Sequence, residues 1–270
     1  MIGSDVRKPS VIALAACLAL ACAARAAAQT RPLQTEEAHT AAAGRIVLEA
    51  GATFMSAEPN FQTGQTRQRL DVPVLNLVYS PAANVELDLE WVGRVIAVDD
   101  PRFGNVSDFG DVTLRSKLRL VDEYGSRPAV AVRFGVTLPE TNEAKGLGPN
   151  TLRMQAQALV SKTIARLAVH GNAGLAIQDA PLSPHLQSDF LAYGVAVVYA
   201  MGDRLDVVAE GAGLVGHGHP GAEARNEVRA GIRYGTGRLR WDAAARRGLS
   251  DADGTWGFTA GLRWTAREPR

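Results

Sequence analysis

The sequence has few features of several common protein classes. Its 270 residues include two cysteines, Cys17 and Cys22, and both lie close to the N-terminus. Beyond residue 24, no apolar run approaches the about 18 residues that a membrane-spanning helix needs. The 29 basic and 28 acidic residues nearly cancel, so no overall field attracts nucleic acid. Phosphate-binding loops and dinucleotide-binding fingerprints are also absent. These absences argue against a disulfide scaffold, a helical membrane protein and a nucleic-acid or nucleotide binder.

The N-terminus has the pattern of a secretory signal peptide. Arg7 and Lys8 precede an unbroken apolar run at Val11–Ala24, which is too short to cross a bilayer. Small residues follow, and we expect cleavage after Ala26 or Ala28, so that residues 1–28 form the signal. Both cysteines then leave with the signal, and the mature chain contains no thiol.

Two details of this N-terminus bear on the interpretation. The tetrapeptide Leu14–Cys17 resembles a lipoprotein signal, but the apolar run continues past Cys17, which disfavours that alternative. Removing Arg7, Lys8, Arg25 and Asp5 leaves a mature chain with one excess negative charge. An exported chain without cysteines or apolar helices is either a soluble periplasmic protein or a β-barrel of the outer membrane.

From about residue 45 onward, apolar and polar residues alternate with period two. In the run Asn84–Ala97, Val85, Leu87 and Leu89 alternate with Glu86 and Asp88. Such alternation places all apolar side chains on one face of a strand. Twelve such runs occur, at about residues 45–55, 67–79, 84–97, 110–121, 128–138, 151–161, 166–178, 188–200, 204–215, 225–234, 238–248 and 255–265.

The lengths of the strands and of their connections favour a barrel over a soluble sandwich. The runs are long enough for the about nine to eleven residues that a tilted strand needs to cross a bilayer. Short turns alternate with longer polar loops, as between periplasmic turns and external loops of outer-membrane barrels. We therefore predict an all-β fold, a closed up-and-down antiparallel transmembrane β-barrel of about 12 strands at residues 44–265. Residues 29–43 would form a periplasmic N-terminal segment, and residues 266–270 a C-terminal overhang.

Aromatic residues and one proline add detail to this prediction. Four of the six strands that descend towards the periplasm end in an aromatic residue, which is typical of an interfacial girdle. The predicted interfacial aromatics are Tyr79, Tyr199, Tyr234 and Trp264. Pro73 interrupts the second strand, and because proline donates no ladder hydrogen bond, it predicts a bulge there.

The chain resembles the outer-membrane transporter family named for the meta-pathway of phenol degradation. The segments that carry the resemblance occur in order and cover most of residues 44–265: DFGDVTLRSKLRL at 108–120, RFGVTLP at 133–139, VHGNAG at 169–174, DRLDVVAE at 203–210 and RGL at 247–249. The resemblance implies a barrel and a role in uptake of small molecules, with aromatic compounds as one class. Family barrels usually stop at a terminal aromatic residue, whereas residues 265–270 follow Trp264 here.

Charged residues concentrate on the polar face of the strands, which would line the lumen. Glu86, Asp88 and Glu90 should face Arg115, Lys117 and Arg119 across an antiparallel pair. Such a row could set the ion preference of a pore, or it could fill a narrow interior with ion pairs. The candidate lumen-lining residues are Glu86, Asp88, Glu90, Arg94, Arg115, Lys117, Arg119, Arg133, His170, Asn172, Glu210, Arg229 and Arg233.

Catalytic and metal chemistry find less support. Ser161 and His170 lie on adjacent predicted strands and could approach each other, but no carboxylate partner or Gly-x-Ser-x-Gly motif accompanies them. His217 and His219 fall short of a full metal-ligand set. We therefore expect no enzyme activity, no cofactor and no metal.

The most consistent hypothesis is a channel for small solutes in the outer membrane of a Gram-negative bacterium. Its expected partners are outer-membrane lipid, the barrel-assembly machinery and an unidentified solute, without nucleic acid. Two alternatives stay open, a plugged structural or adhesive barrel and a barrel lipid hydrolase or acyltransferase.

Overall fold

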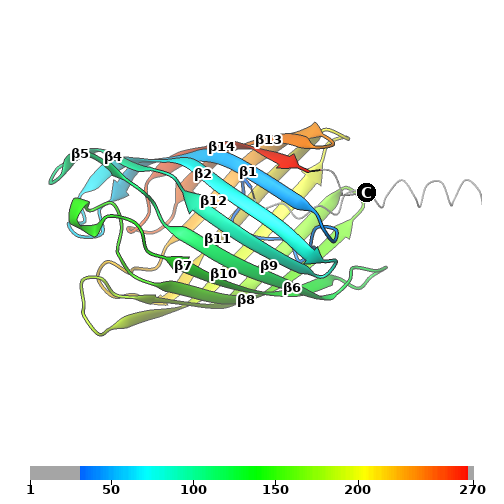
Figure 1. Ribbon diagram of the computed structural model, residues 1–270, viewed down its shortest axis with the longest axis horizontal. Coiled ribbons are helices and arrows are strands. Elements are labelled where there is room, and N and C mark those ends of the chain that lie inside the picture. Colours follow the sequence, from blue (N-terminus) through cyan, green and yellow to red (C-terminus); the bar gives the residue numbers. More distant parts are fainter. Residues whose placement is uncertain (1–30, 267–270) are drawn as a thin grey trace, which may run out of the picture.

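The computed structural model describes residues 31–266, and the predicted signal peptide at 1–28 and most of the C-terminal overhang lie outside this range. The described chain forms one antiparallel sheet that closes on itself, because β1 pairs with both β2 and β14 (Figure 1). Its elements are β1 (Ile46–Pro59), β2 (Thr66–Ala82), β3 (Val85–Val92), β4 (Val95–Asp100), β5 (Gly104–Asp108), β6 (Val112–Val121), β7 (Ala129–Leu138), the 3₁₀ turn η1 (Glu143–Lys145), β8 (Arg153–Ile164), β9 (Leu167–Asp179), β10 (Gln187–Ala200), β11 (Leu205–His217), β12 (Asn226–Thr236), β13 (Leu239–Gly248) and β14 (Trp256–Thr265).

The fourteen strands occupy twelve positions around the barrel wall, here called staves, because two of these positions contain two strands each. β3 and β4 both pair with β2 and together form one stave, interrupted at Gly93. β5 and β6 form the next stave, in which β5 pairs with β4 and β6 pairs with β3. The closed 12-stave antiparallel barrel predicted from the sequence is therefore confirmed. The connection between the predicted strands at 84–97 and 110–121 is a shorter loop than expected, because β4 and β5 continue into it as a hairpin.

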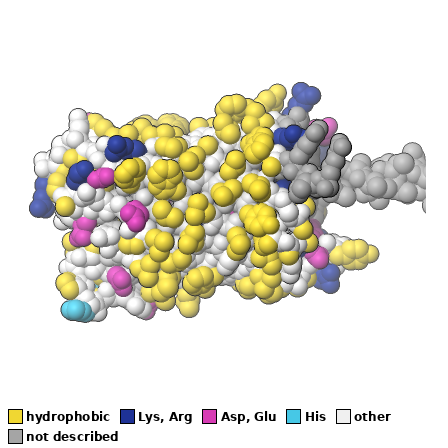
Figure 2. Space-filling view, viewed as in Figure 1, with side chains coloured by type: hydrophobic (Ala, Val, Ile, Leu, Met, Phe, Trp, Pro, Cys, Tyr) yellow, Lys and Arg dark blue, Asp and Glu magenta, His cyan; other side chains and the backbone are white. Residues whose placement is uncertain are grey.

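Burial alternates along the strands in the sense that a membrane barrel requires. On β3, Leu87 and Leu89 are 45% and 42% exposed, whereas Glu86 and Asp88 are 2% and 6% exposed. Apolar side chains thus face outward and charged side chains face inward, the reverse of a water-soluble sandwich. Figure 2 shows a broad hydrophobic band across the visible face of the barrel, with basic and acidic side chains towards its two ends.

The second strand contains the irregularity that the sequence predicts. The β1–β2 register shifts between the pairs Gly51↔Val74 and Thr53↔Asp71. Val72 and Pro73 therefore lie opposite the single residue Ala52, which is a β-bulge. The missing amide hydrogen of Pro73 is accommodated where the ladder is already interrupted.

The segment before the first strand does not lie where the sequence analysis expected it. Residues 31–43, here called the lumen segment, run inside the barrel near the end at which the C-terminus is marked (Figure 1). Leu33 packs against Ala196 and Val208, and Ala38 packs against Leu159. The interpretation of residues 29–43 as a periplasmic segment is wrong for the described part, because these residues find partners on the inner wall.

Candidate functional site

The lumen segment is held by hydrogen bonds from its backbone to wall side chains. The amides of Gln34 and Thr35 donate to the Glu210 carboxylate at 2.7–2.9 Å. The amide of Ala38 donates to Ser161 Oγ at 2.8 Å, and that of Ala41 donates to Glu86 Oε2 at 3.0 Å. Because the segment forms no regular structure, these wall groups replace the ladder partners that a strand would supply.

Glu36 is the central side chain of the lumen segment. It is 2% exposed and pairs with Arg133 at 2.9 Å and with Lys117 at 3.8 Å. From the other direction, the guanidinium groups of Arg229 and Arg233 donate to the carbonyls of Pro32 and Arg31. The segment is therefore joined to charged groups of β6, β7 and β12, on different sides of the barrel.

The predicted row of opposite charges is present, with two of its three ion pairs formed. Lys117 contacts Glu86 at 2.6 Å, and Arg115 contacts Glu90 at 3.0 Å. Asp88 is buried, and neither carboxylate oxygen has a hydrogen-bond partner among the described residues. Arg119 lies close to the end of β6 and pairs with Asp122 in the turn that follows this strand.

One predicted lumen residue lies elsewhere. Arg94 is exposed, and its guanidinium lies 5.5 Å from the centre of the exposed Phe109 ring. The interruption at Gly93 shifts the alternation, so that Val95 faces inward at 1% exposure. The inward assignment of Arg94 is therefore wrong, because it assumed an unbroken strand from 84 to 97.

The remaining predicted lumen residues line the interior, and Arg133, His170, Asn172, Glu210 and Arg233 are all buried. Arg229 forms ion pairs with Glu227 and Glu210. With its side-chain amide oriented to satisfy both polar atoms, Asn172 donates to the Glu36 carbonyl and accepts from the Glu36 amide, each at 2.9 Å.

Ser161 and His170 do approach each other, with Ser161 Oγ 2.8 Å from His170 Nδ1. The Ala38 amide also donates to that oxygen, so the serine hydroxyl joins the lumen segment to the imidazole. Ser161 is 1% exposed beneath the lumen segment, where no substrate can reach it. The pair anchors the segment in this structure.

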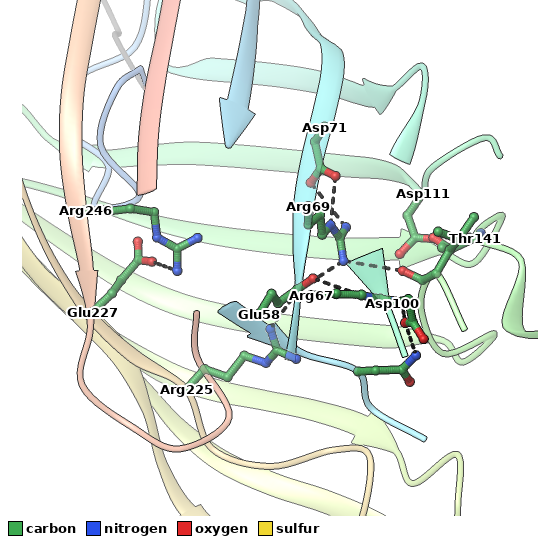
Figure 3. A network of polar contacts seen from close by, with 12 residues as sticks. Glu58, Arg67, Arg69, Asp71, Asp100, Asp111, Thr141, Arg225, Glu227 and Arg246 are labelled. Atoms are coloured by element: carbon green, nitrogen blue, oxygen red, sulfur yellow. Dashed lines mark hydrogen bonds and ion pairs between the residues drawn. The ribbon is translucent and has the colours of Figure 1, made fainter. Parts of the chain in front are cut away.

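A second polar network lies towards the end with the longer loops, which is the external end in outer-membrane barrels (Figure 3). Arg69 reaches Asp71 at 2.8 Å and Glu58 at 3.2 Å, and Arg67 reaches Asp100 at 3.0 Å. Asp111 accepts hydrogen bonds from Thr141 and pairs with Arg153. This network joins the bulged strand β2 to the loop after β7.

A cavity of about 610 Å³ lies between the two networks. Its floor is formed by residues 31–36 of the lumen segment, and Thr141, Gly148 and Pro149 of the loop after β7 line its other end. One side of the cavity is lined by small, weakly polar residues that include Ala176, Ala192 and Ala212. The charged lining is balanced at eight arginines and eight carboxylates: Arg31, Arg69, Arg115, Arg133, Arg153, Arg225, Arg229 and Arg246 with Glu36, Glu49, Glu58, Glu90, Asp111, Glu223, Glu227 and Asp253.

Sequence reasoning missed the lumen segment and the external network. Glu36 precedes the first alternating run, so periodicity carries no signal of its placement. Glu58, Asp100 and Arg225 lie at the ends of strands or in loops, where alternation stops reporting which face a residue occupies.

The four predicted interfacial aromatics lie on the outer face at the end with the short turns. Tyr79, Tyr199, Tyr234 and Trp264 are between 40% and 52% exposed. Between residues 31 and 266, no group of three or more acidic, histidine or cysteine side chains is arranged to hold a metal ion. No helix in the same range is long and apolar enough to cross a membrane.

Comparison with solved structures identifies the same architecture. The chain is similar to the COG4313 outer membrane channel from Pseudomonas putida F1, with 18% identity, a TM-score of 0.61, and coverage of 83% of this chain and 95% of that one. The translocator domain of the autotransporter NalP from Neisseria meningitidis matches at 13% identity and a TM-score of 0.50, over 82% of this chain and 87% of that one. Outer membrane phospholipase A from Escherichia coli matches at 9% identity and a TM-score of 0.46, over 87% and 93% of the two chains.

Sequence comparison gives the family directly. No curated protein matches the chain. The profile of the family described as MetA-pathway of phenol degradation matches residues 30–266, most of the sequence. The chain therefore belongs to this family, and it has the fold of an outer-membrane β-barrel.

Proposed function

We propose that the protein takes up small, largely uncharged aromatic compounds across the outer membrane. The observation that carries the proposal is the cavity above the lumen segment, with its small, weakly polar side and its balanced charged side. A balanced lining offers an ion of either sign little net attraction, whereas an amphipathic neutral solute can use both sides. The family name points to the same class of compound.

The lumen segment would control the lower part of the route. Four backbone hydrogen bonds to wall side chains and the ion pairs of Glu36 hold the segment in the periplasmic half of the barrel. A solute in the cavity must therefore pass beside the segment or displace it. Deleting residues 32–41 should raise ion conductance several-fold in planar bilayers, because it opens a continuous water-filled path.

Uptake can be tested with two substitutions on opposite faces of β11. Ala212 lines the cavity, whereas Gly211 faces outward, where an added Cβ would meet only Val228 Cγ1 at 3.9 Å. Ala212→Trp should lower initial uptake of radiolabelled phenol or toluene at limiting concentration in cells that depend on this channel, and Gly211→Trp should leave it unchanged. Equal uptake in both variants and in a strain lacking the protein would contradict the proposal.

The lumen segment also supports a second candidate, a plugged structural barrel. In that case deleting the protein would not affect aromatic uptake, and the conductance gained by deleting residues 32–41 would serve no physiological transport. The uptake experiment thus separates the two functions.

A further inference from the structure

Three consecutive short turns end in the same dipeptide. Arg166-Leu167 closes the turn between β8 and β9, Arg204-Leu205 the turn between β10 and β11, and Arg238-Leu239 the turn between β12 and β13. In each case the leucine is the first residue of the following strand. The three arginines, here called the rim arginines, therefore occupy equivalent positions on one arc of the periplasmic rim.

The backbone around each rim arginine is fixed in the same way. The carbonyls of Arg166, Arg204 and Arg238 accept hydrogen bonds from the amides of Ala200, Gly235 and Thr265, each at 2.9 Å. Each donor lies on a strand that descends to the same level. Because the three turns share this anchor, the side chains leave the barrel from the same depth.

An aromatic residue lies on the strand next to each Arg-Leu dipeptide. Tyr199, Tyr234 and Trp264 immediately precede the three donor residues in the sequence, and they pair across the sheet with Leu167, Leu205 and Leu239. Tyrosine and tryptophan in an outward girdle mark the boundary between the hydrocarbon and the headgroups. The rim arginines, one residue nearer the periplasm than the leucines, thus lie at the depth of the lipid phosphates.

The rim arginines are also available for a ligand. All three are exposed, and no ion pair joins their side chains to another residue between 31 and 266. Acidic residues of the turn after β6 are engaged elsewhere, Asp122 with Arg119 and Glu123 with Lys162. A similar backbone arrangement recurs at Arg45, immediately before β1, where the Ser80 amide donates to the Arg45 carbonyl at 3.1 Å, and Arg45 has a further partner in the chain.

We propose that the rim arginines bind the headgroups of anionic phospholipids in the periplasmic leaflet. A guanidinium can present two parallel N–H groups to a phosphate, and its long side chain can reach from the rim to the membrane surface. The adjacent leucine contacts the acyl chains, and the aromatic ring packs at the interface. An anionic solute is a poorer fit, because the lumen segment fills the barrel at this end.

The spacing of the rim arginines suits several lipids around one arc. Neighbouring strands lie about 4.8 Å apart, so turns two strands apart are separated by roughly 10 Å. Each arginine can therefore contact a separate headgroup. A basic residue near an anionic membrane surface contributes about 1 kcal/mol, which corresponds to about fivefold in lipid preference.

The test is native mass spectrometry of the full mature protein, equilibrated in micelles with equal amounts of dioleoyl-phosphatidylglycerol and dioleoyl-phosphatidylcholine. The wild-type protein should retain phosphatidylglycerol in clear excess. Each single Arg→Gln substitution should lower the ratio by up to about fivefold. The triple variant Arg166→Gln, Arg204→Gln, Arg238→Gln should approach equal retention, and the corresponding triple lysine variant should keep most of the preference.

The matched control removes three exposed cations towards the external end, Arg94, Arg102 and Arg247. This control variant should keep the wild-type ratio, and heat-dependent gel mobility shows that each variant is folded. The proposal is overturned if the rim variant keeps the wild-type ratio, or if the control lowers the ratio equally. It is also overturned if the wild-type protein shows no preference and the rim variant instead changes the ion selectivity of the open barrel.

Discussion

The buried carboxylates of the lumen differ in how many charged or hydrogen-bonding partners each of them contacts. Glu36 of the lumen segment contacts Arg133 and Lys117, whereas the wall residue Asp88 has no hydrogen-bond partner among the described residues. A buried carboxylate without a partner is unfavourable, and cations near it lower that cost. Withdrawal of Glu36 would leave Arg133 and Lys117 beside Asp88, so the wall retains an acidic group to accompany them.

His39 gives the lumen segment a dependence on pH. Its ring lies 3.6 Å from Glu37 and 3.1 Å from Glu123, in the turn after β6. The Glu37 carboxylate beside the ring, together with Glu123, raises the pKa of His39 above its ordinary value of 6.5. Other titratable groups also act on these carboxylates, His170 and Lys117 on Glu37 and Lys162 on Glu123.

The sign of the effect follows from the raised pKa. The charged form of His39 stabilises the docked segment fully below the pKa of a free histidine, and this contribution disappears as pH rises through the raised pKa. Hydrogen-exchange protection factors of the Ala38 and Ala41 amides should therefore fall as the pH rises from below 6.5 through the raised pKa of His39. In His39→Gln the fall should be much smaller. Equal falls in both proteins would mean that another group controls docking.

At the scale of elements, the loop at residues 139–152 is a folded lid on the cavity. Leu147 is fully buried against Val95 and Ala97, although it belongs to an external loop. The η1 turn is capped by Asn142, whose side chain accepts from the Lys145 amide, and Lys145 pairs with Asp108 at 2.8 Å. The loop is thus held by one apolar anchor and several polar contacts.

Leu147→Ala should release this loop. Truncating a buried leucine costs about 2–5 kcal/mol, which here opposes docking of the loop more than closure of the barrel. Trypsin should then cut after Lys145 several-fold faster than in the wild-type protein. The control is Leu182→Ala in the loop after β9, where the side chain is 41% exposed. An unchanged rate in Leu147→Ala would show that the polar contacts suffice.

The elements differ in how well the sequence predicts them. Strands such as β9 and β13 were predicted within one residue at each end, because alternation and turn residues agree there. The lumen segment and the loop around Leu147 have no period, since their contacts are to distant parts of the chain. Their positions depend on the barrel already being closed.

At the scale of the whole molecule, closure depends on the seam between β1 and β14. Ten residue pairs join these strands, from Val47↔Thr265 to Ser56↔Trp256. A Cβ added at Gly257 would lie 2.2 Å from the carbonyl oxygen of Phe54, so a side chain there forces the seam apart. In a bilayer, an unpaired seam leaves backbone groups without partners, each at a cost of several kcal/mol.

Gly257→Ala should therefore reduce the yield of folded barrel, measured as the fraction that migrates faster on a detergent gel without heating. Gly211→Ala on β11 is the matched control, because a Cβ there meets no atom closer than 3.9 Å. Equal folded fractions would show that the seam can adjust. The barrel architecture itself was predictable from the sequence, whereas the close approach of the two strands at Gly257 can be read only from the register.

The balanced lining of the cavity has a consequence for the route as a whole. Opposite charges that lie close together produce an electric field that decays over a short distance. Dissolved salt therefore changes the field beyond the wall very little. The rate at which an uncharged compound enters should then stay nearly constant between dilute and saline surroundings. Under the proposed function, a bacterium that moves between such habitats would keep the same supply of the proposed solute.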